Sequence, residues 1–220
     1  MSDNENKPAV PFDLPVVDAE INAENIKPFN LNMHTARLLM REPFFAALSR
    51  RIDKIASTAI PTAGVRVNPD SAQFELLYNP EFFAQLEDNH KLGVLKHEFY
   101  HLIFEHVTGR KPADGLKRID NIAMDLSINC HISNELPNEA NPGPTIGKEP
   151  MKACIPGEGM FADLPSFKSY EWYLEALKKK QEEGDDGEGG EGGDPFGDAD
   201  SLDDHDGFGE SDGTTQEIAK

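Results

Sequence analysis

The spacing of hydrophobic residues predicts a mainly helical chain. Between about 32 and 57, seven hydrophobic residues recur at intervals of three or four: Leu38, Leu39, Phe44, Phe45, Leu48, Ile52 and Ile55. This pattern is typical of an amphipathic helix, or of a helix pair broken near Pro43. The same reasoning predicts helices over 80–86, from 89 or 91 to 108, over 116–133 and over 167–180.

One region has the shorter period of β-structure. Residues 64–67 and 73–78 are rich in β-branched, aromatic and aliphatic side chains, and Asn68-Pro-Asp-Ser between them has turn chemistry. We therefore predict a small hairpin or sheet, and an α+β fold. The segment 73–78 is our candidate for a sheet edge that an extended peptide could join as an added strand.

The domain boundaries follow from changes in composition. Residues 1–30 contain four prolines without sustained periodicity, which predicts an extended or disordered N-terminal arm. Residues 31–180 form the expected domain, in which 138–166 is a long loop rich in proline and glycine. Residues 181–220 hold fifteen acidic residues and one lysine among many glycines, which predicts a disordered acidic tail.

Composition excludes several classes of protein. The net charge is −19, mostly from the tail, and no basic patch suits direct binding of nucleic acid. No apolar run is long enough for a membrane span, and the first residues lack the features of a secretory signal. Two cysteines, Cys130 and Cys154, are too few for a disulfide framework. We therefore expect a cytoplasmic protein with free thiols.

The clearest chemical signal is His97-Glu-Phe-Tyr-His101, an H-E-x-x-H motif inside a predicted helix. Residues four apart lie one turn above each other on the same helix face, so both imidazoles can bind one Zn2+ ion. Glu98 lies about 100° around the helix from His97, beside the ligand face. There it would act as the general base on zinc-bound water.

A third ligand must come from another element. Asp125 follows His101 by 24 residues and interrupts an otherwise hydrophobic helix, where a bound cation would offset the cost of burying a carboxylate. It is our choice. His106 is the main competitor, but on a continuous helix it would point about 140° away from His101. Glu105 is a candidate to orient a ligand imidazole through a hydrogen bond.

The remaining histidines and the acidic tail have simpler interpretations. His34, His90 and His131 lie near predicted helix ends, where surface or capping roles are more common than metal binding. His205 lies in the tail. The aspartates between 198 and 206 resemble a calcium loop in composition, but they lack the glycine register and final glutamate of an EF-hand.

With these motifs in place, the chain resembles the metallopeptidase domain of bacterial proteins that carry a von Willebrand factor A-like region and are often associated with MoxR-type AAA+ ATPases. The resemblance covers about 43–177, and its most specific blocks are 95–101 and 121–129. It implies a zincin-like fold, His97 and His101 as metal ligands, Glu98 as the catalytic residue and Asp125 as a ligand. An acidic tail stands where the A-like module would follow.

The resulting hypothesis is a zinc-dependent hydrolase, specifically a metalloendopeptidase that acts on protein or peptide substrates. The same resemblance implies an AAA+ ATPase or another protein as a partner. The alternative is a catalytically inactive, metal-stabilised binding or scaffold protein that uses its acidic tail for docking. Replacing Glu98 separates the two, because only the first needs a general base.

Overall fold

The structure is a computed structural model that describes residues 29–113, 115–146, 149–185 and 196. These residues form an α+β domain of six α-helices, a three-stranded sheet and a two-stranded ribbon, which confirms the predicted fold class. The bounds of its helices and strands are α1 Leu31–Arg41, α2 Pro43–Ser49, β1 Ile52–Ala56, β2 Ala63–Val67, β3 Phe74–Tyr78, α3 Pro80–Gln85, α4 Asp88–Ile103, α5 Arg118–Asn129, β4 Thr145–Ile146, β5 Glu149–Pro150 and α6 Tyr170–Asp185. Within the described part of the chain, none of the helices has the length and hydropathy to span a membrane.

The segment predicted as one helix or a helix pair is two helices followed by a strand. The break near Pro43 is confirmed, because Pro43 begins α2 where its missing N–H is not needed. The prediction was wrong for Ile52 and Ile55, which lie in β1 and not on a helix. β1 pairs in parallel with β3, from Ile52 opposite Phe74 to Ala56 opposite Tyr78. Local spacing cannot reveal a ladder between such distant segments.

The hairpin is confirmed, but the edge assignment was wrong. β2 pairs antiparallel with β3, and the Asn68 side chain accepts hydrogen bonds from the N–H groups of Asp70 and Ser71 to close the turn. The strand order is β1-β3-β2, so β3 is central and both of its edges are already paired. Peptide addition along β3 is therefore excluded.

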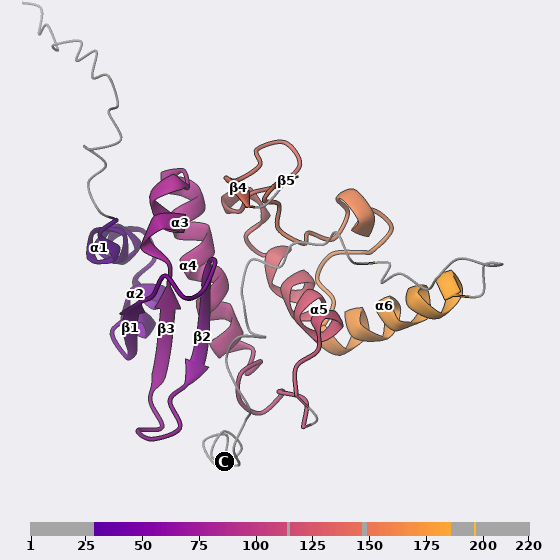
Figure 1. Cartoon of the computed structure of the whole chain (residues 1–220), viewed down its shortest axis with the longest axis horizontal. Coiled ribbons are helices and arrows are strands. Elements are labelled where there is room, and N and C mark those ends of the chain that lie inside the picture. The colour runs from indigo at the N-terminus through magenta and orange to yellow at the C-terminus, as the bar shows by residue number, and fades with distance from the viewer. Residues whose placement is uncertain (1–28, 114, 147–148, 186–195, 197–220) are drawn as a thin grey trace, which may run out of the picture.

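Helix α4 lies between the sheet and the pair formed by α5 and α6 (Figure 1). It packs against β2 on one side and α5 on the other. One hydrophobic cluster fills the space between α4 and the sheet, and a second joins α5 to α6. All ten residues from Asp120 to Asn129 are buried, and α5 contributes Ile128 to the first cluster and Ile122 to the second.

The C-terminal part of the domain extends beyond residue 180. Helix α6 continues to Asp185, and Phe196 is buried in the second cluster with its ring stacked on Phe161 at 6.4 Å. Arg118 Nη2 donates a hydrogen bond to the Phe196 carbonyl at 3.0 Å. The predictions for 1–28, 186–195 and 197–220 concern residues outside those the structure describes.

Candidate metal centre

Helix α4 brings the two motif histidines together as the spacing predicts. His97 and His101 are one turn apart, and their Nε2 atoms lie 3.1 Å from each other. Both side chains are fully buried, with 0% of their surface exposed. The two ring nitrogens therefore face one point inside the domain.

Helix α5 supplies the third group. Asp125 Oδ1 lies 3.5 Å from His97 Nε2 and 3.5 Å from His101 Nε2, and its side chain is also 0% exposed. These three residues form a group whose donor atoms could hold one metal ion. The pairing of α4 with α5 thus places the aspartate where the sequence interpretation needed it.

The donor set fits zinc in both geometry and chemistry. Zinc bonds of about 2.0 to 2.1 Å in a tetrahedron place neighbouring donors about 3.3 Å apart. The three observed separations, 3.1, 3.5 and 3.5 Å, lie close to that value. Two imidazoles and one carboxylate are also a usual ligand set for catalytic zinc, which keeps a further position for water.

Glu98 follows His97 directly on α4 and is fully buried. A carboxylate is costly to bury unless a charge or hydrogen-bond donor compensates it. The burial of the Glu98 carboxylate therefore fits a polar or metal-binding site better than an ordinary hydrophobic core.

Asn129 is a residue of the site that the sequence analysis missed. Its Oδ1 lies 2.7 Å from His97 Nδ1, the ring nitrogen on the opposite side from Asp125. Its Nδ2 donates to the Cys154 carbonyl at 2.9 Å. A signal was available, because Asn129 is a polar residue four positions after Asp125 and hence on the same face of a buried helix.

His106 makes a contact that the argument from a continuous helix excluded. Helix α4 ends at Ile103, and Glu105 adopts a left-handed φ of 61°. The His106 N–H then bonds to the His101 carbonyl at 2.9 Å, and His106 Nδ1 lies 3.2 Å from His101 Nδ1. His106 therefore contacts the ring of His101, one of the three candidate ligands. The role expected for Glu105 was wrong, because its side chain is exposed and the Nδ1 atoms of His97 and His101 face Asn129 and His106 instead.

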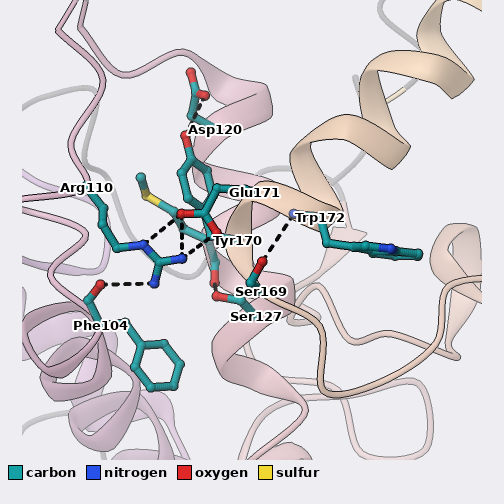
Figure 2. Close-up of polar contacts among 9 residues, drawn as sticks. Phe104, Arg110, Asp120, Ser127, Ser169, Tyr170, Glu171 and Trp172 are labelled. Carbon is teal, nitrogen blue, oxygen red and sulfur yellow. Dashed lines mark hydrogen bonds and ion pairs between the residues drawn. The ribbon is translucent and has the colours of Figure 1, made fainter.

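A polar network around Arg110, Glu171 and Tyr170 holds the segment that follows α4 (Figure 2). Arg110 binds the Glu171 carboxylate through Nε at 2.9 Å and through Nη2 at 2.6 and 2.5 Å. Next to Glu171, the Tyr170 ring lies 5.8 Å from the His106 ring, and its hydroxyl donates to Asp120 Oδ1 at 3.1 Å. The network thus links this segment to α5 and α6.

The ionisation of this network follows from burial and charge. Burial, and then the Asp120 carboxylate, raise the pKa of Tyr170 far above its ordinary value, so the phenol keeps its proton. The hydrogen bond from the Arg110 guanidinium lowers the pKa of Glu171, which stays ionised. Tyr170 and Glu171 therefore keep fixed protonation states at neutral pH. They stabilise the local structure and are poor candidates for proton transfer.

Two of the three histidines interpreted as surface or capping residues are buried. His34 and His90 are each 3% exposed, so their predicted surface position was wrong. Burial lowers the pKa of both rings, which are therefore mainly neutral near pH 7. His131 is exposed as expected and stacks on Tyr100 with ring centroids 5.8 Å apart. None of the three belongs to the candidate metal group.

The predicted loop over 138–166 contains a pocket of about 210 Å³. Glu139, Glu149, Glu158 and Lys152 are among its lining residues. Cys154 also lines it, and the carbonyl of this residue accepts the bond from Asn129. The pocket is therefore linked to His97 through the hydrogen bonds of Cys154 and Asn129.

Comparison with protein families agrees with this geometry. A family model described as "Putative metallopeptidase domain" matches residues 27–219, which is nearly the whole chain. No curated protein and no solved structure gives a match. The buried His-His-Asp group and the extent of the family match lead to one identification: the chain belongs to the family described as a putative metallopeptidase domain.

Proposed function

We propose that the protein is a zinc-dependent metalloendopeptidase with a zincin-like fold. In this proposal His97, His101 and Asp125 bind the ion, and Glu98 is the general base. The observation that carries it is the convergence of three buried donor atoms at separations of 3.1 to 3.5 Å. The family match supports a metal-dependent peptidase, and the donor chemistry favours zinc over harder cations.

The chemistry divides between the ion and the chain. Held by His97, His101 and Asp125, zinc would supply Lewis-acid chemistry, which polarises carbonyl groups and makes water more acidic. The chain contributes the general base, Glu98, which follows the candidate ligand His97 in α4. The Glu98 carboxylate takes one proton from the attacking water, and the resulting carboxylic acid gives that proton to the leaving amine nitrogen when the C–N bond breaks. Glu98 is thereby restored.

The complete burial of the site favours a second candidate function. His97, Glu98, His101 and Asp125 are each 0% exposed, so a polypeptide reaches them only after a movement that opens the site. Structural zinc sites are closed in this way, although they have four protein ligands. The alternative is therefore a binding or scaffold protein that keeps the metal for stability.

One set of variants separates the two functions. Zinc content of the purified full chain is measured by elemental analysis, and hydrolysis is measured with a fluorescein-labelled unfolded protein. We expect one zinc per chain in the wild type and loss of zinc in His97→Ala. Glu98→Gln should keep its zinc and lose roughly 10²- to 10⁴-fold in rate, the usual contribution of a general base. Glu105→Gln is a matched control, because that glutamate is exposed.

Each result has a definite meaning. Equal, substoichiometric zinc in the wild type and His97→Ala would overturn the metal site. Full zinc with no hydrolysis, or with equal hydrolysis by the wild type and Glu98→Gln, would reject the peptidase and leave the binding protein.

A further inference from the structure

His97, Asn129 and Cys154 form a continuous hydrogen-bonded chain inside the domain. His97 Nδ1 lies 2.7 Å from Asn129 Oδ1, and Asn129 Nδ2 donates to the Cys154 carbonyl at 2.9 Å. His97 and Asn129 are 0% exposed and Cys154 is 3% exposed. Both distances are those of well-formed hydrogen bonds shielded from water.

The chain of donors and acceptors has one consistent assignment. A backbone carbonyl can only accept, so the amide nitrogen of Asn129 must point toward Cys154. The amide oxygen then points toward His97, and an amide oxygen is also only an acceptor. The hydrogen between Asn129 and His97 must therefore sit on His97 Nδ1. In the neutral ring this leaves the lone pair on Nε2.

We propose that Asn129 is a positioning residue that sets the tautomer and orientation of His97. The Cys154 carbonyl fixes the amide, and the amide fixes the imidazole with its Nε2 lone pair toward Asp125 and His101. A cation can bind only to a lone pair, so the protein selects the competent form of the ring in advance. This inference rests on the proposed zinc site.

Helix α5 is suited to this double role. Asn129 lies four residues after Asp125, so one helix face presents both the carboxylate and the amide that orients the neighbouring ring. Both residues belong to the stretch of ten buried residues in the centre of the domain. Ligand and support therefore move as one rigid unit.

The corresponding contact of His101 lacks this selectivity. Its Nδ1 lies 3.2 Å from His106 Nδ1, and either imidazole can be the donor in such a pair. His106 can therefore orient the His101 ring without imposing one tautomer. Asn129 differs because the Cys154 carbonyl, which can only accept a hydrogen bond, fixes the orientation of its amide.

The first measurement compares zinc affinity in three forms of the full chain: wild type, Asn129→Leu and Asn129→Asp. Affinity is obtained at pH 8 by competition with a chromophoric chelator, and the free energy of unfolding by urea titration in EDTA. We expect Asn129→Leu to weaken zinc binding 10- to 100-fold, the usual effect of losing such a support. Asn129→Asp keeps an acceptor for His97 Nδ1–H and should recover most of the affinity.

Ser127→Ala is the matched control. Ser127 is a buried polar residue of α5 whose hydroxyl donates to the Met124 carbonyl, so its loss should affect stability and leave zinc affinity unchanged. Unchanged affinity in Asn129→Leu would overturn the proposal. Equal losses in the Leu and Asp variants would also overturn it, because they would indicate packing alone.

A second measurement determines the tautomer of His97 and requires neither bound zinc nor enzymatic activity. Long-range proton–nitrogen NMR of the metal-free wild type at pH 8 should show His97 protonated at Nδ1 and unprotonated at Nε2. The opposite tautomer would reject the inference, including in the case where Asn129→Leu fails to fold. A wild type that binds no zinc but shows the expected tautomer would reject the proposed function and keep the role of Asn129.

Discussion

Gly93 offers a direct test of how α4 sits in the domain. It lies inside α4, where a Cβ atom would meet the Glu135 carbonyl oxygen at 1.9 Å and its carbon at 2.6 Å. Glu135 ends the 3-10 turn Ser133–Glu135, which follows α5 closely. Ordinary contact between such atoms begins near 3.4 Å, so Gly93→Ala requires the two backbones to part by about 1.5 Å.

Two opposing terms set the size of the effect. Alanine is favoured over glycine inside a helix by about 1 kcal/mol. Overpacking costs about 1 to 3 kcal/mol, and the upper end applies because the atoms in conflict belong to the backbone and cannot rotate away. We therefore expect Gly93→Ala to lower the free energy of unfolding by about 2 kcal/mol. For a domain of this size, the midpoint temperature should fall by about 4 to 8 °C.

The same displacement should reach the metal centre. Gly93 lies one turn before His97 on α4, and the obstructing turn lies just after Asn129 on the chain. A relative shift of about 1.5 Å would lengthen the contact between His97 and Asn129, and misplacements of this size are costly in preorganised sites. Zinc affinity should fall on the order of tenfold.

Urea unfolding in EDTA, followed by circular dichroism, measures the first effect, and chelator competition measures the second. Glu175→Ala, at an exposed position of α6, should stay within about 0.5 kcal/mol of the wild type. If Gly93→Ala equals or exceeds the wild type in stability, helix propensity dominates and the close approach of α4 to Glu135 is refuted.

Three further outcomes follow from the structure. Asp125→Asn should weaken zinc binding about 10²- to 10³-fold, because the binding free energy of structural zinc sites, about 10 to 16 kcal/mol, divides among four ligands. An unchanged affinity in chelator competition would exclude Asp125 as a ligand. Phe196→Ala should lower the free energy of unfolding by about 2 to 4 kcal/mol in urea titration, because the ring is buried against Phe161; no effect would place it outside the core. Burial lowers the pKa of His34 and His90 below 6.5, so the unfolded chain binds protons more readily and stability should fall as pH drops below about 6.5. His90→Gln should make that fall shallower in EDTA, and an unchanged slope would contradict a neutral buried ring.

The sequence was most informative where the chemistry depends on local periodicity. His97 and His101 are related by one helical turn, and Asp125 stood out as a charge within a hydrophobic helix. Both features follow from helix geometry and the cost of burying charge, so neither requires knowledge of the tertiary structure. The pairing of α4 with α5 could then be inferred because one cation needs all three donors.

The missed features depend on non-local contacts or on single backbone angles. β1 exists because it pairs with β3, and the spacing of Ile52 and Ile55 fits a helix as well as a strand. The contact of His106 with His101 depends on a left-handed φ at Glu105, a conformation that non-glycine residues adopt rarely. Burial of Phe196 likewise arises from packing against a distant part of the chain.

The position of the site between two layers has a consequence for stability. His97 and His101 belong to α4, which packs on the sheet, whereas Asp125 belongs to α5, which packs on α6. An ion bound to all three would connect the two layers and their separate hydrophobic clusters. Because such a site is assembled only in the folded chain, a zinc concentration 100 times the Kd should add about 2.7 kcal/mol to the free energy of unfolding. The metal would therefore stabilise the fold whether or not Glu98 is catalytic. Zinc retention alone consequently cannot distinguish an enzyme from a binding protein, and the comparison of hydrolysis by the wild type and Glu98→Gln is needed.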